Sequence, residues 1–443
     1  MDIYEIAIYG ITFVFIGWVI YNYLEKAKKI SLATQAKVEV AKATGRFEPL
    51  SLYPYIDPKI CIGSGACVSA CPEKDVLGIM NGTGTLINTT SCIGHGACFL
   101  ACPVDAISLR IGTEKRGVEL PHVKPNYETN VDGIFIAGEL GGMGLIKNSI
   151  EQGIQAVVAS KKRIELSKAK LEGSLDLVII GAGPAGIGAA LKAKELGLNY
   201  LVLEQESLGG TVFTYPRAKI VMTHPVDLPL HGPVKLINTN KQELLAMWEL
   251  LRDQYQLNIK ENTKVNTINK RGDGFILEIN GGSPIEARAV ILAIGRRGTP
   301  RKLNVPGELS TKVAYRLLDA EAIKGERILV VGGGDSAVES ALLLMDQNEV
   351  FLSYRKNAFA RIKALNEEQI QRSIAENRVS ILFESEVLEI SDDNVRLIQN
   401  GSELSLPKID RIYIFAGGEL PTDFLKNAGI EMELAVNKIV KEH

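Results

Sequence analysis

The most pronounced hydrophobic pattern lies at the start of the chain, where residues 6–24 contain no charged side chain. As a helix this stretch would rise about 28 Å, close to the hydrocarbon thickness of a bilayer. Two acidic residues precede it, and Lys26, Lys28 and Lys29 follow it. The positive-inside bias therefore predicts a transmembrane anchor over residues 1–25, single-pass in the inner (cytoplasmic) membrane, with the bulk of the protein in the cytoplasm.

A buried core helix is the alternative interpretation of this stretch. A cleaved signal peptide fits less well, because signal peptides begin with basic residues and this chain begins with acidic ones. Residues 26–55 are rich in Lys, Ala and Glu and contain no helix breaker before Gly45, so they predict a polar helical stalk.

A second pattern, LDLVIIGAGPAGIGAALKAKELGLNYLVLEQ, begins at Leu175 and reads as buried strand, glycine turn, helix and second strand. This is the signature of a dinucleotide-binding unit. Gly181 would make the tight turn, Gly183 would let a pyrophosphate approach the helix N-terminus, and Gly186 would allow close packing of helix on strand. Glu204 closes the second strand, where an acid would accept hydrogen bonds from a ribose.

The design recurs in RILVVGGGDSAVESALLL, with Gly332, Gly334 and Ala337 at the turn. The following strand, EVFLSYRK, ends in cations where the first unit has an acid, and these cations are Arg355, Lys356 and, shortly after, Arg361. Positive charge at this point suits a 2′-phosphate, so NADPH is the expected cofactor. A solvated cluster of charges is the alternative.

Composition limits the possible functions. With 443 residues and 46% hydrophobic content, the chain can form two or three domains with cores of their own, and its net charge of −2 argues against a nucleic-acid partner. All six cysteines lie between Cys61 and Cys102. Such clustering indicates metal ligands in a reducing compartment, because a secreted disulfide framework would distribute its cysteines along the chain.

The cysteines occur in two copies of one pattern, CIGSGACVSACP and CIGHGACFLACP. The pattern is that of the bacterial iron–sulfur run, in which three closely spaced cysteines bind one cluster and a fourth, followed by Pro, binds the other. Residues 56–112 are therefore expected to form a dicluster ferredoxin-like domain. The crossed arrangement predicts the following two ligand sets: Cys61, Cys67 and Cys102; and Cys92, Cys98 and Cys71.

Each copy departs from the pattern at its second position, which is Ser64 in one and His95 in the other. The missing thiolate leaves three alternatives, namely a 3Fe-4S cluster, a 4Fe-4S cluster closed by the Ser64 oxygen or the His95 nitrogen, or an open iron. The module resembles the short ferredoxins that serve bacterial haem-thiolate monooxygenases, and that resemblance favours 3Fe-4S. A structural zinc site and disulfides are the other readings, but the C-x2-C spacing of zinc sites is absent.

The two glycine units, joined by AVILAIGRRGTPRKLNVPGE, resemble the thioredoxin-reductase-like branch of two-dinucleotide-binding flavoproteins over roughly residues 175–425. The resemblance implies FAD on the first unit and NADPH on the second, with Ala293 and Gly295 at the crossing between the domains, and it implies a homodimer. The Cys-x-x-Cys pair that gives thioredoxin reductases their activity is absent from both units, and position 185 is Ala where some related enzymes have Cys.

One piece of the family's pattern stands out of order. In the family the chain returns to the FAD domain after the NADPH domain, whereas here the corresponding strand and helix, TNVDGIFIAGELGGMGLIKNSIEQG, lie upstream at residues 129–153. The simplest account is a circular permutation. By resemblance, Gly138 and Glu139 face the ribityl chain, where the family has Asp for Glu139, and the helix after Gly144 points its N-terminus at the flavin. A coincidental strand–turn–helix is the alternative.

These patterns together predict an α/β protein with two Rossmann-like domains, a small ferredoxin-like domain and an N-terminal transmembrane helix. The expected boundaries beyond the cysteine module are a displaced FAD-domain segment (113–170), an FAD domain (171–303), an NADPH domain (304–418) and a return to the FAD domain (419–443). Because residues 104–128 are the only connector upstream of the displaced segment, the clusters are expected to lie close to the flavin.

The function expected from this organisation is that of a membrane-anchored NADPH-dependent oxidoreductase. It would pass electrons between NADPH, FAD and two iron–sulfur clusters, to or from a one-electron carrier, a membrane-bound redox protein or a quinone, without a catalytic acid–base residue. Two alternatives are a flavin-dependent disulfide or small-molecule reductase with a structural cysteine module, and a membrane-tethered redox sensor.

Overall fold

The computed structural model describes residues 3–49, 52–73, 75–92, 94, 96–115, 117–142, 144–166, 173–213, 220–221, 225–235, 239–296, 299–359 and 362–441. The chain divides into two compact units. Unit 1 is Met1–Val118 with Val436–His443, and unit 2 is Glu119–Ala435.

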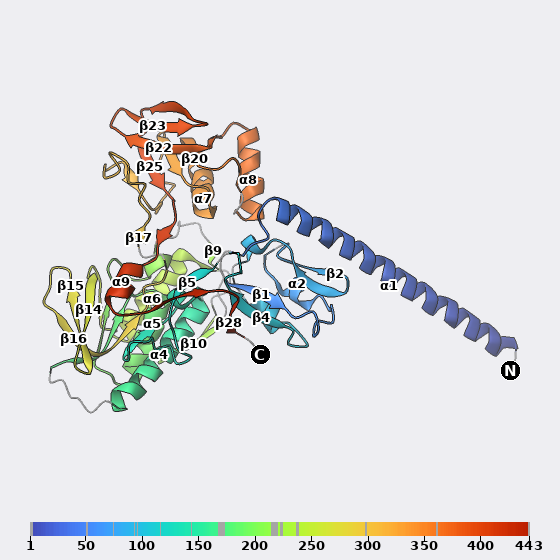
Figure 1. Cartoon of the computed structure of the whole chain (residues 1–443), viewed down its shortest axis with the longest axis horizontal. Helices are drawn as coiled ribbons and strands as arrows, with labels where there is room; N and C mark the ends of the chain where they lie inside the picture. Colours follow the sequence, from blue (N-terminus) through green and yellow to red (C-terminus); the bar gives the residue numbers. More distant parts are fainter. Residues whose placement is uncertain are drawn as a thin grey trace. The chain divides into compact units, whose positions relative to one another are not determined.

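In unit 1 the expected anchor and stalk form one helix, α1 (Ile3–Ala43), whose 41 residues correspond to about 62 Å (Figure 1). It ends at Ala43, and Gly45 just beyond it has a φ of +71°, as the left-handed residue that follows many helices does. The stretch Ile8–Ala43 is long and apolar enough to cross a bilayer, and no other helix in the described part of the chain meets that condition. The apolar side chains of residues 8–24 are exposed, Phe13 to 82%, so this part of the helix is not a core helix of unit 1.

The last turns of α1 pack on a hairpin of the cysteine module. Ser31 Oγ accepts a hydrogen bond of 3.0 Å from the backbone N–H of Asn81, and Lys37 forms an ion pair with Asp75. Thr34 is buried there, and a Cβ on Gly78 would lie only 2.7 Å from the Thr34 methyl group. The stalk is therefore part of the folded module.

The module itself combines two short helices with two small antiparallel sheets. Its elements are β1 (Leu52–Ile56), α2 (Ala66–Ala70), β2 (Leu77–Met80), β3 (Thr83–Leu86), η1 (Thr89–Ser91), α3 (Ala97–Leu100) and β4 (Ile107–Ile111). β2 pairs with β3, and β1 pairs with β4 so that Leu52 lies opposite Ile111. The helices α2 and α3 follow Gly65 and Gly96, one in each copy of the cysteine pattern.

The C-terminal strand β28 (Lys438–Lys441) joins this sheet at the free edge of β4, with Lys438 opposite Ile111. The Tyr53 hydroxyl donates a 2.9 Å hydrogen bond to the Asn437 side-chain oxygen beside it. The sequence predicted that residues 419–443 belong to the FAD domain. The structure differs in β28, which pairs with the cysteine module. The unpaired backbone groups of an edge strand such as β4 provide a ready template for a further strand.

Unit 2 contains two sheets of Rossmann type, which confirms the predicted α/β fold. The first runs in the order β13-β8-β7-β16-β15-β14, and its core is parallel. The elements of this region are β5 (Val118–Pro121), β6 (Ile134–Ile136), η2 (Glu139–Gly141), α4 (Ile146–Leu166), β7 (Leu175–Ile180), α5 (Pro184–Glu195), β8 (Tyr200–Leu203), η3 (Gly210–Val212), β9 (Ile220–Val221), β10 (Val226–Leu228), β11 (Gly232–Val234), β12 (Thr239–Asn240), α6 (Lys241–Gln254), β13 (Ile259–Lys260), β14 (Val265–Arg271), β15 (Gly274–Ile279) and β16 (Ile285–Leu292).

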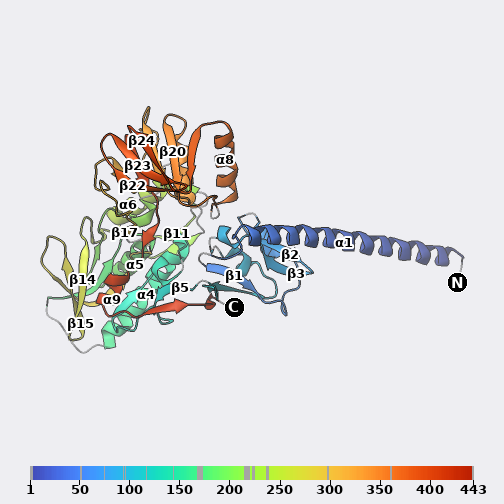
Figure 2. The same cartoon turned by 45° about the horizontal axis from the view of Figure 1, so that its top comes forward.

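The upstream segment supplies a strand and a helix to this first sheet. β6 pairs in parallel with β16, with Ile134 opposite Val290. α4 lies beside α5 (Figures 1 and 2), where glycines allow the two backbones to approach. A Cβ on Gly153 of α4 would lie 2.0 Å from the Ala185 carbonyl oxygen, and a Cβ on Gly188 of α5 would lie 2.6 Å from that of Ile150.

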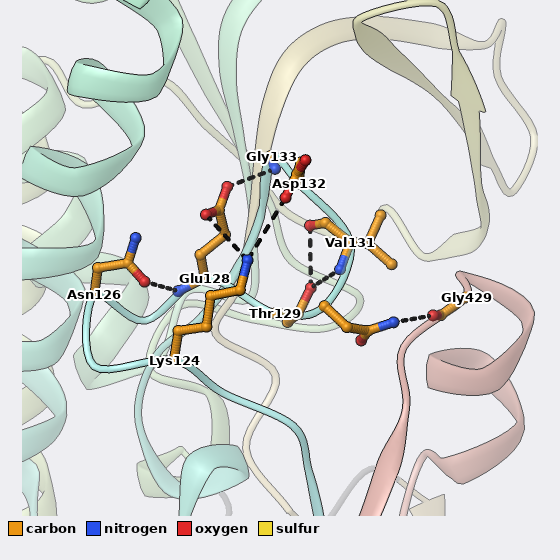
Figure 3. Close-up of polar contacts among 9 residues, drawn as sticks. Lys124, Asn126, Glu128, Thr129, Val131, Asp132, Gly133 and Gly429 are labelled. Carbon is orange, nitrogen blue, oxygen red and sulfur yellow. Dashed lines mark hydrogen bonds and ion pairs between the residues drawn. The ribbon is translucent and has the colours of Figure 1, made fainter.

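The loop that enters β6 is held by its own hydrogen bonds (Figure 3). Thr129 Oγ1 accepts from the Val131 N–H at 3.1 Å, and the Glu128 carboxylate accepts from the Gly133 N–H at 2.9 Å. Lys124 lies between the carboxylates of Glu128 and Asp132, 3.7 and 3.6 Å from them.

Asn130 in the same loop reaches the far end of unit 2. Its side-chain amide donates to the Gly429 carbonyl and accepts from the Glu431 N–H, both at 2.9 Å. Leu425 and Ile430 share a buried core with Ile134 and Val178. Residues separated by about 300 positions in the sequence thus complete one fold.

The second sheet is parallel, in the order β18-β25-β19-β20-β21, with α7, α8 and a three-stranded antiparallel sheet β22-β23-β24. The remaining elements of the chain are β17 (Thr299–Pro300), β18 (Val313–Ala314), β19 (Arg327–Val331), α7 (Asp335–Leu344), β20 (Glu349–Tyr354), α8 (Ala364–Ala375), β21 (Val379–Phe383), β22 (Ser385–Ile390), β23 (Asn394–Gln399), β24 (Ser402–Pro407), β25 (Arg411–Ile414), β26 (Gly418–Glu419), α9 (Thr422–Asn427) and β27 (Met432–Ala435). β17 pairs with β26 between the two sheets, and β27 pairs with β5.

The place of β6 and α4 in the first sheet predicts the behaviour of two truncated chains. A chain of residues 119–443 should unfold cooperatively, whereas a chain of residues 171–443 should not. The shorter chain loses the buried side chains of β6 and α4, among them Phe135, Ile150 and Val157. At 1.5–3 kcal/mol for each large apolar side chain, their loss would cost on the order of 10 kcal/mol, comparable to the whole stability of a domain. Thermal melts followed by circular dichroism measure this, and equal cooperative melts would contradict it.

Candidate cofactor and cluster sites

The six cysteines line two separate cavities of unit 1. Cys61, Cys67 and Cys102 line one of them, and Cys71, Cys92 and Cys98 line the other. Each cavity thus takes two thiols from one copy of the pattern and one from the other copy. The structure gathers the cysteines in the two sets that the crossed pattern predicts, and all six are free thiols.

The backbone conformation around the cysteines directs their thiols toward these cavities. Gly63 and Gly94 adopt φ of +66° and +70°, and a Cβ on Gly63 would lie 2.1 Å from the Gly82 carbonyl oxygen, so only glycine fits there. Backbone N–H groups point at the sulfurs, with Gly84 N 3.3 Å from Cys61 Sγ and Ala106 N 3.2 Å from Cys102 Sγ. Such N–H···S bonds favour an anionic sulfur, as a metal-bound thiolate is.

Burial has the opposite effect on the thiols. It raises the pKa of Cys92 to about 11 and that of Cys98 to about 12, and the neighbouring cysteines add to both rises. Without positive charge in the cavity these thiols would stay protonated at neutral pH, so an iron–sulfur cluster would have to displace their protons. The donor set fits such a group, since three sulfurs face each cavity.

The arrangement fits a cluster better than one ion. Within the described residues, no three His, Cys, Asp or Glu side chains are placed to hold a single metal ion. A zinc ion requires its ligands about 2.3 Å away, whereas a cluster of several irons spreads its thiolates more widely. Ser64 lies in the cavity of Cys61, where its Oγ accepts a 3.4 Å hydrogen bond from the Ala66 N–H. His95 lies outside the described residues.

One charged residue at these cavities escaped the sequence analysis. Glu73 lines the cavity of Cys71, Cys92 and Cys98, and its charge adds to the effect of burial in raising the pKa of Cys71. A position-by-position comparison of the two repeats would have drawn attention to it, because the residue after the Cys-Pro pair is Glu73 in the first copy and Val104 in the second.

Unit 2 encloses a cavity of about 750 Å³, a size typical of ligand sites. The glycine turns of both sheets open into it. The expected site residues among its lining are Gly138, Glu139, Gly181, Gly183, Glu204, Ala293, Gly295, Gly334 and Ala337.

The remaining expected residues lie elsewhere. Gly186 packs behind the first turn, where a Cβ would lie 1.8 Å from the Gly181 carbonyl oxygen, and a Cβ on Gly332 would lie 2.6 Å from that of Phe415. Arg355 and Lys356 are exposed after β20, and they are not part of the described cavity lining. Arg361 lies outside the described residues.

The two turns leave room where a dinucleotide would approach. At Gly183 the nearest protein atom to an added Cβ is 3.9 Å away, and at Gly334 nothing lies within 4 Å. By contrast, Gly181 has φ of +105° and a Cβ there would meet the Ala293 carbonyl oxygen at 2.5 Å. The first turn is therefore tight on the protein side and open on the cavity side, which fits a pyrophosphate at the N-terminus of α5.

Glu204 is positioned at the end of β8 by the neighbouring backbone. It is 5% exposed, and its carboxylate accepts hydrogen bonds from the N–H groups of Ala182 at 2.7 Å and Glu206 at 3.0 Å. Burial raises the pKa of Glu204, and these two N–H groups oppose the rise. The acid therefore links the first turn to the second strand.

The upstream segment contributes one wall of the cavity. Gly138 donates its N–H to the Gln152 side-chain oxygen at 2.8 Å, and Gly144 and Ser149 place the first turn of α4 on the cavity. The Glu139 carboxylate lies near Gly295, just after the end of β16, where an added Cβ would be 4.0 Å from it. Burial lowers the pKa of Arg296, and the charge of Glu139 partly restores it.

Comparison with known proteins identifies both parts of the chain. Residues 178–442 match the pyridine nucleotide-disulphide oxidoreductase family, and residues 53–103 match a 4Fe-4S dicluster domain. The chain belongs to the pyridine nucleotide-disulphide oxidoreductase family. This confirms the resemblance to thioredoxin-reductase-like flavoproteins and to dicluster ferredoxins, and it makes the protein an oxidoreductase with an iron–sulfur module.

Individual relatives match about half of the chain. A ferredoxin–NADP reductase of Ignicoccus hospitalis is 29% identical over 262 residues, which cover 58% of this chain and 82% of that protein. One from Rickettsia massiliae is 31% identical over 191 residues, 42% of this chain and 54% of that protein, so the match spans about half its length. The bacillithiol disulfide reductase of Staphylococcus aureus shares the fold, with a TM-score of 0.51 and 23% identity over 58% of this chain and 81% of that one.

The hydrogen bonds of Glu204 predict the effect of removing its carboxylate. In Glu204→Ala the N–H groups of Ala182 and Glu206 lose their acceptor, so the free energy of unfolding should fall by about 1–3 kcal/mol. Glu278 is exposed on β15, and Glu278→Ala is the matched control, expected to change it by no more than about 0.5 kcal/mol. Urea unfolding followed by fluorescence makes the comparison, and equal effects of the two substitutions would contradict the structural role of Glu204.

Proposed function

We propose that the protein is a membrane-anchored NADPH-dependent flavin and iron–sulfur oxidoreductase that exchanges electrons with a one-electron carrier, a membrane-bound redox protein or a quinone. One observation carries this proposal. A single chain holds a cavity shared by two dinucleotide-type turns and a module with two sets of three thiols. When bound, FAD accepts a hydride and releases electrons singly, which is the conversion that NADPH and iron–sulfur clusters require.

In this proposal the first turn holds FAD. Gly181, Gly183 and Gly186 admit its pyrophosphate to the N-terminus of α5, and Glu204 accepts a ribose hydroxyl. Gly138 and Glu139 face the ribityl chain, and Ala293 and Gly295 form the crossing beside it. The open backbone at Gly183 and the cavity lining support these roles.

The second turn would hold NADPH through Gly332, Gly334 and Ala337. Arg355, Lys356 and Arg361 would bind its 2′-phosphate, and the exposure of the first two leaves them accessible to a ligand. Two relatives are named ferredoxin–NADP reductases, which supports NADP as the nicotinamide cofactor and a ferredoxin-like carrier as the electron partner. Electrons could flow from NADPH or toward NADP, and the family resemblance supports a homodimer.

Each cluster would be held by three cysteine thiolates, and we favour 3Fe-4S for both. The crossed sets of cysteines support this, together with the hydroxyl of Ser64 in place of a fourth thiol. A 4Fe-4S cluster closed by Ser64 or His95 is the alternative, and the substitutions Ser64→Cys and His95→Cys distinguish the two. Under the 3Fe-4S proposal each converts the spectrum of one cluster into that of a 4Fe-4S cluster.

The circular permutation is also a proposal. It is supported by the pairing of β6 with β16, by the contact of α4 with α5, and by the hydrogen bonds from Asn130 to Gly429 and Glu431. Upstream and downstream ends of unit 2 meet at β5 and β27, as the new ends of a permuted domain would, since they lie where the family's chain is continuous. If residues 171–443 alone bound FAD at full occupancy, the permutation would be excluded.

The exposed apolar surface of α1 supports the proposal of a membrane anchor. The apolar stretch ends near Leu24, and contacts with the cysteine module begin at Ser31, about 10 Å further along the same helix. The module would thus be held near the bilayer surface, which supports a partner in or at the inner membrane.

Anchoring predicts different fractionation of two chains. The full chain should remain in the membrane pellet after alkaline carbonate extraction. Residues 26–443 should be released, because this chain lacks the exposed apolar side chains, such as Phe13 and Trp18, that a bilayer would surround. Release of the full chain by carbonate would contradict a spanning helix.

Electron transfer through the module predicts a selective loss of activity. In the double variant Cys67→Ser, Cys98→Ser, NADPH should still bleach the flavin absorbance, while reduction of a protein one-electron acceptor should fall at least tenfold.

In the unaltered chain NADPH should reduce the flavin faster than NADH, and Arg355→Glu should reduce that preference by repelling the 2′-phosphate. Stopped-flow absorbance and anaerobic electron paramagnetic resonance provide the measurements.

The two alternatives predict other results. A disulfide or small-molecule reductase with a structural cysteine module would retain turnover in the double variant, although the absence of cysteine from residues 178–442 gives it no disulfide there. A redox sensor would bind NADPH without sustained turnover. Zinc in place of iron and sulfide in anaerobic protein would exclude the electron-transfer proposal.

A further inference from the structure

The two cluster cavities differ in one charged residue. After the fourth cysteine of each repeat and its proline, the chain continues with Glu73 in the first copy and Val104 in the second. The structure places both side chains at equivalent points, since Glu73 lines the cavity of Cys71, Cys92 and Cys98, and Val104 lines the cavity of Cys61, Cys67 and Cys102. Apart from the thiols, Glu73 is the only ionisable side chain among the described lining residues of either cavity.

Apart from Glu73 and the thiols, the described side chains that line this cavity are apolar. The cavity that Glu73 shares with three cysteines is also lined by Val76, Leu77 and Leu109. Val76 and Leu77 are at most 4% exposed. Between unit charges the Coulomb energy is inversely proportional to the local dielectric constant, so the partly buried Glu73 carboxylate would act on the cluster more strongly than a fully exposed one. A fixed negative charge opposes the arrival of an electron.

Resting on the proposed function, we infer that Glu73 lowers the reduction potential of the cluster at Cys71, Cys92 and Cys98, and that it thereby directs the electron toward the cluster at Cys61, Cys67 and Cys102. With both clusters bound, one electron would pass from the cluster at Cys71, Cys92 and Cys98, which would be oxidised, to the other cluster, which would be reduced. No bond forms or breaks and no proton needs to move. The role of Glu73 is indirect, because its charge would change the reduction potential of the cluster while its carboxylate would not bind the iron.

The test is an anaerobic redox titration of the full chain, followed by electron paramagnetic resonance. Glu73→Gln keeps the size of the side chain and removes its charge. The potential of the cluster at Cys71, Cys92 and Cys98 should rise, shifting the one-electron equilibrium between the clusters by about tenfold, which corresponds to about 59 mV. The other cluster should keep its potential. Ser64→Cys, which alters only the cavity of Cys61, assigns the signals to their clusters.

Val104→Glu is the matched control, because it places the acid at the equivalent point of the other cavity. It should lower the potential of the cluster at Cys61, Cys67 and Cys102, so that both substitutions narrow the difference between the two potentials from opposite sides. Unchanged potentials in Glu73→Gln, or equal shifts of both clusters, would overturn the inference.

Iron and sulfide contents separate this outcome from other failures. A variant with the iron content of the unaltered chain and unchanged potentials disproves the role of Glu73 alone, while the proposed function stands. A chain without iron–sulfur clusters disproves the proposed function. If Glu73→Gln did not fold, Val104→Glu would still test the inference. The electrostatic account would be contradicted if Val104→Glu did not lower the potential of the cluster at Cys61, Cys67 and Cys102 selectively.

Discussion

The close contact of α4 with α5 is the constraint on which the architecture of unit 2 depends. Gly153 and Gly188 bring the two backbones so near that an added Cβ would overlap a carbonyl oxygen on the opposite helix. This contact holds the upstream strand β6 in register with β16. As a result Gly138, Glu139 and the first turn of α4 form one wall of a cavity whose other walls come from residues much later in the chain. Helices that pack at backbone distance have little freedom to slide, so the cavity wall is as rigid as the sheet.

The order of elements along the chain has a structural consequence at the junction of the two units. The chain passes from unit 1 into unit 2 through β5 and returns to unit 1 after β27, and these two strands pair with each other. A segment inserted where the two ends of a domain already meet disturbs few of the contacts within that domain. The same return brings β28 to the edge of β4, so the chain end closes the sheet of the cysteine module.

Within the cysteine module two opposing effects act on the same sulfurs. Burial holds the thiols of Cys92 and Cys98 in the protonated state, whereas backbone N–H groups directed at the sulfurs favour the thiolate. A positive metal centre resolves this conflict, because it supplies the charge that burial has removed with the water. Under the proposed function, the folding of the module would therefore be coupled to cluster binding, and the charge of Glu73 at one cavity would act on the potential of the cluster there.

Local chemistry determined much of this protein from sequence alone. The spacing of the cysteines predicted the two thiol sets, the glycine turns predicted both Rossmann-like sheets, and an unbroken apolar run predicted a helix long enough to cross a membrane. Each of these signals depends on residues close together in the chain, where geometry leaves few choices. Only the tertiary structure decided that anchor and stalk form one helix, that β28 joins the cysteine module, that Glu73 faces one cluster cavity, and that Arg355 and Lys356 stand apart from the described lining of the main cavity. These features arise from contacts between distant residues, which a local pattern does not encode because packing and edge pairing are decided when the whole chain has folded.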